Sequence, residues 1–434
     1  MEIPYVTAME HEPLPIAHGP PEKRLSYEEA EQLAAVGELR PGFCERGYRS
    51  MKLSRYSGIV SLGGRVLEIL PKVDERLPPD ACRGILLRLL RHAGDLPLFR
   101  HAPAGQHLTN APLLEVFIAA FFEAVMQIVR GGLLHQYLQV EDDLRVVRGA
   151  IITARQFAVH SNRPDRVSCR FDELTADNRW NRLLKLGLHT VRPWVSSAEL
   201  YRQWRELWAL FDEVDHLRAE RRMLDQLAYD RHAARYRPAV EWVRWIVGLL
   251  SPSLRAGSAA APALLFDTSA LFQSAVGSVL RGGAGRGVEV SLEETERSLV
   301  QVTGSGGRQA YRLRPDFVAR RGTAVAAVGD AKWKRVPVGK SGYLFPGEAD
   351  LYQMHAYAAA YDCASVALIY PWHAGLASSR ETSFEIRRKD GEMARVTVMC
   401  VDVGSDALTL RRGAEAPELG AIMQPGRGSD LYLR

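Results

Sequence analysis

The sequence has few cysteines, and none of them is arranged to bind a structural metal. Its five cysteines stand singly among 434 residues, without a C-x-x-C pair or a tight cluster with histidine. A structural zinc site needs such a cluster, so this class of site is excluded. Unpaired cysteines fit a reducing compartment, and we expect a cytoplasmic protein.

Segments for export or membrane insertion are also lacking. The N-terminal residues MEIPYVTAMEHEPLP contain no basic region followed by an apolar stretch, so no signal peptide is expected. The most apolar run, residues 113–129, is interrupted by Glu115, Glu123 and Gln127, which are costly in lipid. We therefore expect a core helix there and no contact with a membrane.

Several catalytic signatures are missing. There is no G-x-S-x-G elbow of a serine hydrolase and no H-E-x-x-H helix of a zinc protease. Residues 339–341 read GKS, but a phosphate-binding loop needs a glycine five positions before Gly339, where Lys334 stands. We expect that this chain binds no nucleotide.

The composition is that of a globular protein with more than one domain. The chain is 47% hydrophobic and 25% charged, and its 434 residues are too many for one ordinary core. A net charge of +5 and a pI near 8.9 suit a polyanionic partner without requiring one.

Hydrophobic periodicity predicts two domains before the last one. Residues 1–130 are expected to form an α+β domain, with strands over 40–73, a hairpin turn at Gly63 and Gly64, and helices over 81–129. Residues 131–255 are expected to be mostly helical, with a strand-like stretch LRVVRGAIIT and a helix capped by Thr175 or Asp177. Helical patterns then run from about 198 to 250.

The last predicted domain, residues 256–434, follows the small-residue stretch SLRAGSAAAPA. It opens with a predicted helix, LFDTSALFQSAVGSVLRG, and continues into strands. A helix from about Glu348 to Tyr361 and a strand CASVALIYP follow. This order predicts an α/β domain with a mixed sheet flanked by helices.

The residues that suggest chemistry lie in YRLRPDFVARRGTAVAAVGDAKWKR, residues 311–335. Two apolar-rich strands flank the polar residues 320–323, which predicts a hairpin. A turn centred near Thr323 places Asp316 opposite Asp330, and strand alternation puts Asp330 and Lys332 on one face.

Two facing carboxylates repel each other unless positive charge lies between them, and a divalent metal is the expected source of that charge. Mg²⁺ prefers oxygen ligands and keeps several waters, so Asp316, Asp330 and the backbone carbonyl of Ala331 would suffice, with Mn²⁺ as a substitute. Such a metal can polarise a phosphodiester and activate water, with Lys332 assisting. A surface hairpin with a solvated ion pair remains the alternative.

Pro315-Asp316 with Asp330-Ala331-Lys332 resembles the signature of the restriction-endonuclease-like, or PD-(D/E)xK, nuclease superfamily. Several branches of that superfamily add Gln-x-x-x-Tyr on a following helix. DLYQMHAYAAAY supplies Gln353 and Tyr357 one helical turn apart, with Asp350 on the same side as a further candidate.

Further stretches resemble the McrC family, the nuclease subunits of McrBC-type restriction systems that attack DNA with modified cytosines. They are ILPKV, RGGLLHQYLQVEDDLRVVRGAI, CRFDELTADNRWNRLLKLGL and LFDTSALFQ, and the similarity runs from about residue 58 to 372. The resemblance implies a separate partner, the hexameric AAA+ GTPase ring McrB. It also implies that the N-terminal part of this chain docks on the ring and stimulates GTP hydrolysis.

One residue departs from the family pattern. Where relatives often have glutamate in the helix LFDTSALFQ, this chain has Gln273, which puts a second metal site in doubt. The acids that could substitute for it are Asp267, Glu293, Glu294 and Glu296.

A basic tract, ERGYRSMKLSRYSG, interleaves tyrosines with Arg46, Arg49, Lys52 and Arg55. These residues could contact phosphates or the partner ring. A solvated strand edge is the alternative.

The sequence therefore predicts a Mg²⁺-dependent endonuclease that cuts modified double-stranded DNA when a GTPase partner permits it. Two rival hypotheses stay open: a regulatory subunit that activates an AAA+ partner with little catalysis of its own, and a nuclease of the same fold for another nucleic acid.

Overall fold

The computed structural model describes residues 5–17, 24–62, 65–93, 111–217, 227, 229–250, 261–301, 309–388, 391–405 and 408–411. The chain separates into two compact units. The middle unit holds the described residues of Leu114–Pro262, and the terminal unit holds those of Tyr5–Arg100 and Ala263–Arg434 together with residues 111–113. The three predicted domains, with boundaries near 130 and 255, stay a prediction.

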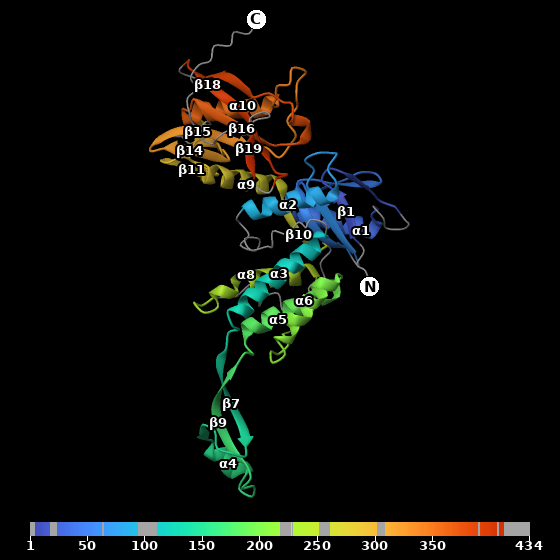
Figure 1. Cartoon of the computed structure of the whole chain (residues 1–434), viewed down its shortest axis with the longest axis vertical. Helices are drawn as coiled ribbons and strands as arrows, with labels where there is room; N and C mark the ends of the chain where they lie inside the picture. Colours follow the sequence, from blue (N-terminus) through green and yellow to red (C-terminus); the bar gives the residue numbers. More distant parts are fainter. Residues whose placement is uncertain are drawn as a thin grey trace. The chain divides into compact units, whose positions relative to one another are not determined.

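Two small sheets and two helices form the N-terminal part of the terminal unit (Figure 1). The larger sheet has the strand order β1-β6-β5-β10, and the smaller one has the order β2-β4-β3. The strands are β1 (Tyr5–Met9), β2 (Pro13–Pro15), β3 (Cys44–Arg46), β4 (Ser50–Leu53), β5 (Tyr56–Leu62), β6 (Arg65–Leu70) and β10 (Ala263–Asp267). The helices are α1 (Tyr27–Leu39) and α2 (Pro79–Ala93).

The predicted hairpin of this region is confirmed. Strands β5 and β6 pair antiparallel, with Leu62 opposite Arg65. The predicted turn residues Gly63 and Gly64 lie outside the described residues. Every residue of both strands is buried, as expected of strands that are covered on both faces.

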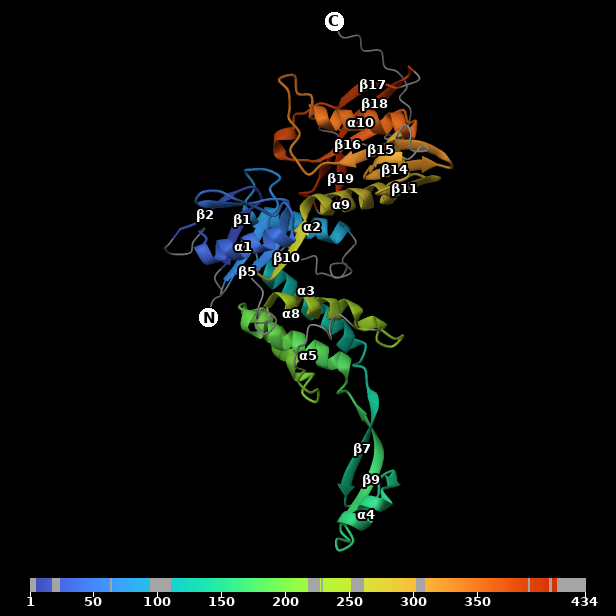
Figure 2. The same cartoon turned by 180° about the vertical axis from the view of Figure 1, so that it is seen from behind.

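Strand β10 follows the middle unit in sequence but pairs with β5 of the N-terminal sheet, beside which it lies in Figure 2. Asp267 at its end stands opposite Tyr56. The prediction that LFD opens a helix was wrong, because these residues extend along β5. Helix α9 (Thr268–Gly282) begins after Asp267, whose carboxylate accepts the N–H groups of Ser269 and Ala270 as an N-cap.

A mixed sheet forms the C-terminal part of the terminal unit, as predicted. Its strand order is β11-β14-β15-β16-β18-β17, with β19 also paired to β18. Strands β15, β16 and β18 are parallel to one another, and the other pairs are antiparallel. The strands are β11 (Val288–Leu292), β14 (Phe317–Arg321), β15 (Ala324–Ala331), β16 (Ser365–Pro371), β17 (Thr382–Arg387), β18 (Met393–Asp402) and β19 (Thr409–Arg411).

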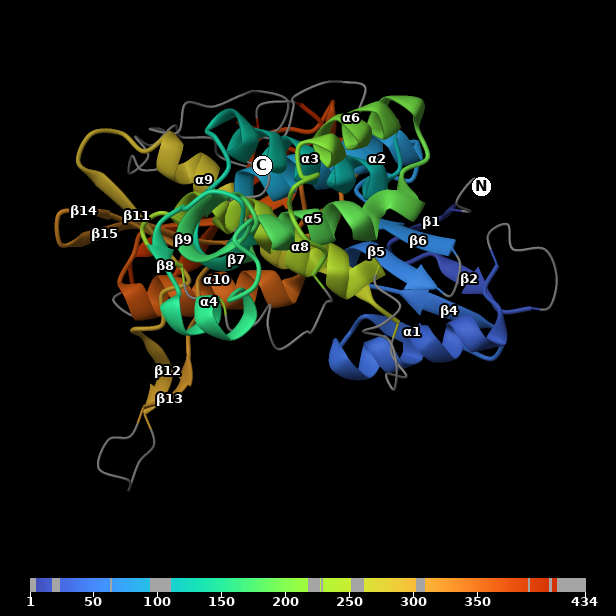
Figure 3. The same cartoon turned by 90° about the horizontal axis from the view of Figure 1, so that it is seen from below.

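Helices α9 and α10 lie on opposite sides of this sheet (Figure 3). Helix α10 (Glu348–Tyr361) matches the predicted range and packs against β15, β16 and β18. Helix α9 packs against β11 and β15. A separate two-stranded ribbon, β12 (Ser298–Gln301) with β13 (Gln309–Arg312), precedes β14. The central strand β15 is therefore contacted by both helices.

The middle unit combines helices with a three-stranded sheet of order β7-β9-β8. Its main elements are α3 (Leu113–Arg130), β7 (Gln136–Leu144), β8 (Ala150–Ile151), α4 (Thr153–Val159), β9 (Val167–Thr175), α5 (Arg179–Val191), α6 (Ala198–Ala209) and α8 (Arg237–Leu250). The predicted core helix is confirmed as α3. Among the described residues, none of the helices combines the length and apolar character that crossing a lipid bilayer requires.

Other expectations for the middle unit were wrong. The stretch LRVVRGAIIT is not one strand, because a turn with Gly149 at φ 68° separates the end of β7 from β8. The long strands β7 and β9 were missed, since most of β7 is exposed and carries no clear alternation. The helical patterns predicted over about 198–250 are found as α6, which ends at Ala209, and α8, which begins at Arg237, while the described residues 210–217 after α6 are not helical.

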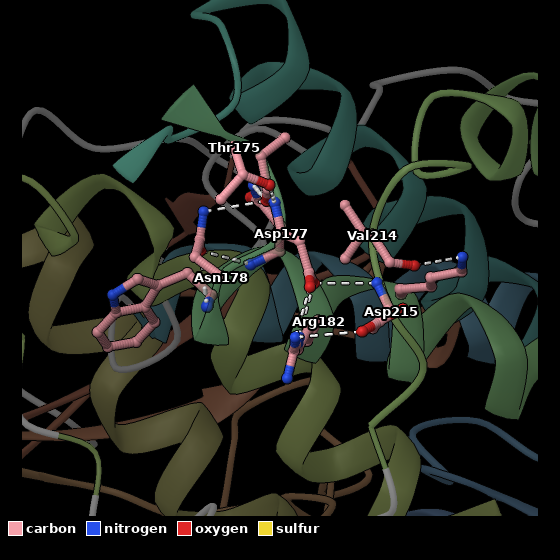
Figure 4. A network of polar contacts seen from close by, with 10 residues as sticks. Thr175, Asp177, Asn178, Arg182, Val214 and Asp215 are labelled. Carbon is pink, nitrogen blue, oxygen red and sulfur yellow. Dashed lines mark hydrogen bonds and ion pairs between the residues drawn. The ribbon is translucent and has the colours of Figure 1, made fainter. Parts of the chain in front are cut away.

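The cap of α5 is Asn178, and neither Thr175 nor Asp177 has that role (Figure 4). The Asn178 side-chain oxygen accepts the N–H groups of Trp180 and Asn181. The Asp177 carboxylate instead pairs with Arg182, and this hydrogen bond lowers its pKa to about 2.

Strand β5 needs glycine at position 58, because Gly58 has φ +141° and a Cβ there would lie 2.1 Å from the carbonyl oxygen of Leu264 in β10. We expect Gly58→Ala to lower the free energy of unfolding by about 3 kcal/mol. The control is Gly282→Ala at the end of α9, where nothing lies within 4 Å of the added Cβ. Denaturant unfolding checks this, and equal midpoints for the two variants would contradict the close approach of β5 and β10.

Candidate active site

The β14–β15 hairpin brings Asp316 and Asp330 together. Phe317 pairs with Gly329, Val318 with Val328 and Ala319 with Ala327, which agrees with the predicted register. A bulge after Ala319 shifts the last two pairs by one residue before the turn. Asp316 directly precedes β14, and Asp330 lies near the end of β15.

Gly329, the residue before Asp330, has no room for a side chain. A Cβ there would lie 2.3 Å from the Phe317 ring and 2.5 Å from the carbonyl oxygen of Ala367 in β16. Glycine at this position therefore lets β14 and β16 lie close on both sides of the strand that carries Asp330.

Asp316 is half-buried, and its Oδ2 accepts the N–H of Ala331 at 2.6 Å. Burial raises the pKa of Asp316 to about 7, and the nearby charge of Asp330 adds to this effect. The two carboxylates are thus close enough for the charge of one to oppose ionisation of the other.

Asp330 is 2% exposed and lies between a lysine and helix α10. Its Oδ1 accepts a hydrogen bond from Gln353 Nε2 at 3.1 Å, and the Tyr357 hydroxyl lies 3.3 Å from the same oxygen. Its Oδ2 forms an ion pair with the Lys332 ammonium. No described residue donates a hydrogen bond of ordinary geometry to Oδ2, so this buried oxygen still has a lone pair to offer.

Helix α10 supplies Gln353 and Tyr357 from one face, as their spacing predicts. Gln353 Nε2 donates to the Tyr357 hydroxyl at 2.7 Å, and that hydroxyl donates to the carbonyl oxygen of Arg314 at 2.8 Å. Burial, with a smaller contribution from the charge of Asp330, raises the pKa of Tyr357, so its hydroxyl stays protonated. The structure therefore brings five predicted site residues together: Asp316, Asp330, Lys332, Gln353 and Tyr357.

Asp350 has other partners. The Lys334 ammonium lies 2.9 Å from its Oδ1 and 2.7 Å from its Oδ2, and the Tyr370 hydroxyl donates to Oδ2 at 2.7 Å. Lys334 was not predicted as a site residue. No sequence signal identified it, because β15 ends at Ala331 and the chain turns at 332–334, where strand alternation no longer holds.

Gln273 is half-buried on α9, the helix that packs against β15 from the side opposite α10. Asp267, one acid that could have replaced the missing glutamate, caps α9 and binds Arg55 at 2.8 Å. Both contacts hold the Asp267 carboxylate where α9 meets the N-terminal sheet.

The other three candidate acids follow β11. Glu294 and Glu296 form ion pairs with Arg320, and the hydrogen bonds from Arg320 lower the pKa of Glu294. Glu293 is exposed, and its backbone N–H donates to the carbonyl oxygen of Asp316 at 3.2 Å. Of these acids, Glu293 is the one with a hydrogen bond to a residue of the carboxylate pair.

The residues at the carboxylate pair fit a hard divalent cation with few protein ligands. Within the described ranges, no group of three acidic, histidine or cysteine side chains is placed to hold a metal ion. Two carboxylates, one of them with an oxygen free of ordinary hydrogen bonds, would leave the remaining positions to backbone oxygens and water. That is the ligation typical of Mg²⁺.

The four basic residues of the tract 45–58 have different neighbours, and their predicted contact with phosphates or a partner stays a prediction. Arg46 binds Glu31 at 2.6 Å and Arg55 binds Asp267, so both have acidic partners. Lys52 lies on β4, the central strand of its sheet, so the alternative of a solvated edge does not hold for it. Arg49 lies 5.7 Å from the centre of the Tyr48 ring.

Comparisons with known proteins cover most of the chain. The family model described as McrBC 5-methylcytosine restriction system component matches residues 51–371, about three quarters of the sequence. No curated protein matches the sequence.

The fold is similar to that of a solved structure, and a second solved structure is matched more weakly. One is a chain of the refined half-complex from a tetradecameric assembly of Thermococcus gammatolerans McrB AAA+ hexamers with bound McrC, with a TM-score of 0.68 and 18% identity. The match covers 93% of this chain and 96% of that chain. The other is a chain of the cryo-EM structure of the Thermococcus gammatolerans McrBC complex, with a TM-score of 0.47, 18% identity, and coverage of 65% of this chain and 89% of that chain.

The raised pKa of Asp316 predicts how stability changes with pH. In metal-free protein, the folded chain holds a proton on Asp316 up to a pKa of about 7, whereas the unfolded chain loses it near the ordinary value of 3.8. Folded protein binds more protons between these values, so stability should fall as pH rises from about 4 to 7.

We therefore expect Asp316→Asn to melt at a higher temperature than the wild type at pH 8, and the gap to shrink at pH 5. Thermal melting with a chelator present measures it, and Asp165→Asn in an exposed turn is the control. An equal gap at both pH values would show that the charge of Asp316 is not the cause.

Proposed function

This chain belongs to the McrBC 5-methylcytosine restriction system component family, and on that premise we propose that it is the metal-dependent nuclease subunit of a GTP-dependent restriction system. Its substrate is foreign double-stranded DNA that carries modified cytosine, and the reaction is hydrolysis of a phosphodiester. The observation that carries the proposal is the meeting of Asp316, Asp330 and Lys332 at the end of the β14–β15 hairpin.

Each residue has a proposed role in this reaction. Asp316, Asp330 and the backbone carbonyl of Ala331 hold Mg²⁺, for which Mn²⁺ can substitute. The metal, when bound, supplies Lewis acidity to the phosphodiester and lowers the pKa of a bound water. The Lys332 ammonium stabilises the charge that develops on the phosphate oxygens.

Gln353 and Tyr357 position the Asp330 carboxylate from α10. Gln353 donates to Asp330 Oδ1, and the Tyr357 hydroxyl, whose hydrogen goes to the carbonyl oxygen of Arg314, lies 3.3 Å from the same oxygen. Tyr357 stays protonated because burial raises its pKa. These contacts hold one oxygen of Asp330 in place and leave Oδ2 directed at Lys332. A hairpin followed by the parallel strands β15, β16 and β18 with α10 beside them supports a restriction-endonuclease-like, PD-(D/E)xK fold for this domain.

The proposed partner is an McrB-like AAA+ GTPase ring in the cytoplasm. In Thermococcus gammatolerans, McrC is bound to McrB AAA+ hexamers, and a chain of that assembly shares its fold with this protein. This chain would bind no nucleotide itself and would stimulate GTP hydrolysis by the ring. Among the basic residues of the tract 45–58, Arg49 and Lys52 are the candidates for contact with the ring or with phosphates.

A regulatory subunit with little catalysis is the second candidate. It is favoured by the absence, among the described residues, of a third side chain able to complete a metal site, and by Gln273 in place of an acid. Intact Asp316, Asp330 and Lys332 weigh against it. Metal binding separates the two candidates.

Lys332→Ala should reduce the rate of DNA cleavage by about 10²- to 10³-fold, since it removes a cation from the reacting phosphate. The assay contains the partner ring, GTP and methylated plasmid. Lys340→Ala, in an exposed segment eight residues later, should cut normally. Undiminished cleavage by Lys332→Ala, with GTPase stimulation intact, would refute the assignment.

Calorimetric titration of the full chain with Mn²⁺ should show one binding event that Asp330→Asn abolishes. The reason is that Asn keeps the shape of the side chain but loses the charge that attracts the cation. Asp350→Asn is the matched control, because Asp350 is occupied by Lys334 and Tyr370 and should not affect the event. No Mn²⁺ affinity in the wild type, with GTPase stimulation preserved, would favour the regulatory candidate.

A further inference from the structure

The residue after Lys332 is tied to the opposite end of the chain. Trp333 Nε1 donates a hydrogen bond to Glu10 Oε2 at 3.1 Å, across a sequence separation of 323 residues. Trp333 is half-buried, and Glu10 is 1% exposed. A buried carboxylate thus stands beside a residue that is adjacent in sequence to the proposed catalytic lysine.

Glu10 belongs firmly to the N-terminal sheet. It directly follows β1, and its own N–H donates to the carbonyl oxygen of Leu70 in β6 at 2.8 Å. The backbone N–H groups of Lys72 and Arg55 also face its carboxylate and favour its charged form, although burial raises the pKa of Glu10. These contacts come from the ends of neighbouring strands, so the position of the carboxylate follows the position of that sheet.

The other side of Trp333 packs against α9. The Phe272 ring lies 5.3 Å from the Trp333 ring, centre to centre, and Phe272 is fully buried. The start of α9 is itself joined to the N-terminal sheet: Thr268 N–H donates to the carbonyl oxygen of Arg55 at 2.9 Å, and Arg55 pairs with Asp267. Both contacts of Trp333 therefore lead to the same sheet.

The backbone at Lys332 is held on its remaining side by β16. Lys332 N–H donates to the carbonyl oxygen of Ile369 at 2.8 Å, and Lys334 N–H donates back to the carbonyl oxygen of Lys332 at 2.9 Å. These bonds set where the chain leaves β15. Trp333 is the middle residue of the turn at 332–334, so its contacts act on the segment that carries Lys332.

We propose that Glu10 and Trp333 are positioning residues through which the N-terminal sheet sets the placement of the Lys332 ammonium beside Asp330. The inference rests on the proposed function. It assigns a route by which partner binding at the N-terminal part reaches the cutting site, since a shift of that sheet moves Glu10, Trp333 and the lysine together. A misplacement of about 1 Å at a reacting group can cost about 10²-fold in rate.

The test compares single-turnover cleavage by Trp333→Phe, Glu10→Ala, Glu10→Gln and the double variant Glu10→Ala/Trp333→Phe, each with the partner ring and GTP. Trp333→Phe keeps an aromatic ring against Phe272 and removes the N–H donor. Its matched control is Trp372→Phe, because the indole N–H of Trp372 has no hydrogen-bond partner among the described residues.

We expect Trp333→Phe and Glu10→Ala to lower the cleavage rate about 10- to 100-fold without changing KM for DNA. Glu10→Gln should restore most of the rate, because its amide oxygen still accepts the indole hydrogen. The double variant should be no slower than the slower single variant, since both remove one contact. Melting temperatures near that of Trp372→Phe would separate positioning from general destabilisation.

Wild-type rates for both single variants, or effects that multiply in the double variant, would overturn the inference. If Glu10→Ala does not fold, Trp333→Phe against Trp372→Phe still decides. The cleavage rate of Lys332→Ala shows whether the proposed function or only the positioning role is wrong. Normal cutting by Lys332→Ala rejects the proposed function itself, whereas a dead Lys332→Ala beside a normal Trp333→Phe rejects only the role of Trp333 and Glu10.

Discussion

The repulsion between Asp316 and Asp330 is the constraint around which the C-terminal part of the molecule is arranged. The hairpin register places both carboxylates at one end of β14 and β15, where burial and mutual repulsion raise the pKa of Asp316 to about 7. Part of this repulsion is offset by three groups: the Ala331 N–H, the Lys332 ammonium and the Gln353 amide of α10. We propose that a divalent cation held by both acids offsets the rest of it.

Packing and polar contacts, in addition to the chain itself, connect the N-terminal sheet of β10 with the C-terminal sheet of β15. Strand β10 completes the N-terminal sheet beside β5, and α9, which begins at its end, packs on the strand that carries Asp330. Arg55 and Glu10 add polar contacts across the same join. The proposed partner-binding part and the proposed cutting site therefore belong to one folded unit.

Local pattern was sufficient for much of the site. The alternation of side chains along two short strands predicts that Asp316, Asp330 and Lys332 meet, and the spacing of Gln353 and Tyr357 predicts one helical face. Reasoning from local patterns failed for β7 and for the cap of α5, where contacts with other parts of the chain decide the structure. Strand β7 is mostly exposed and lacks the alternation of buried and exposed residues that identifies a strand. Asn178 caps α5, whereas the Asp177 carboxylate pairs with Arg182.

By itself, the sequence determined the contacts whose partners lie within one hairpin or one helix, because strand and helix periods fix which side chains share a face. Only the tertiary structure decided which distant groups these residues meet. In the folded chain, Asp350 contacts Lys334 and Tyr370. Asp267 pairs with Arg55, and Glu10 accepts a hydrogen bond from Trp333 across a sequence separation of 323 residues. No local period encodes such pairs, since they arise when separate elements pack and a buried polar group must find a partner.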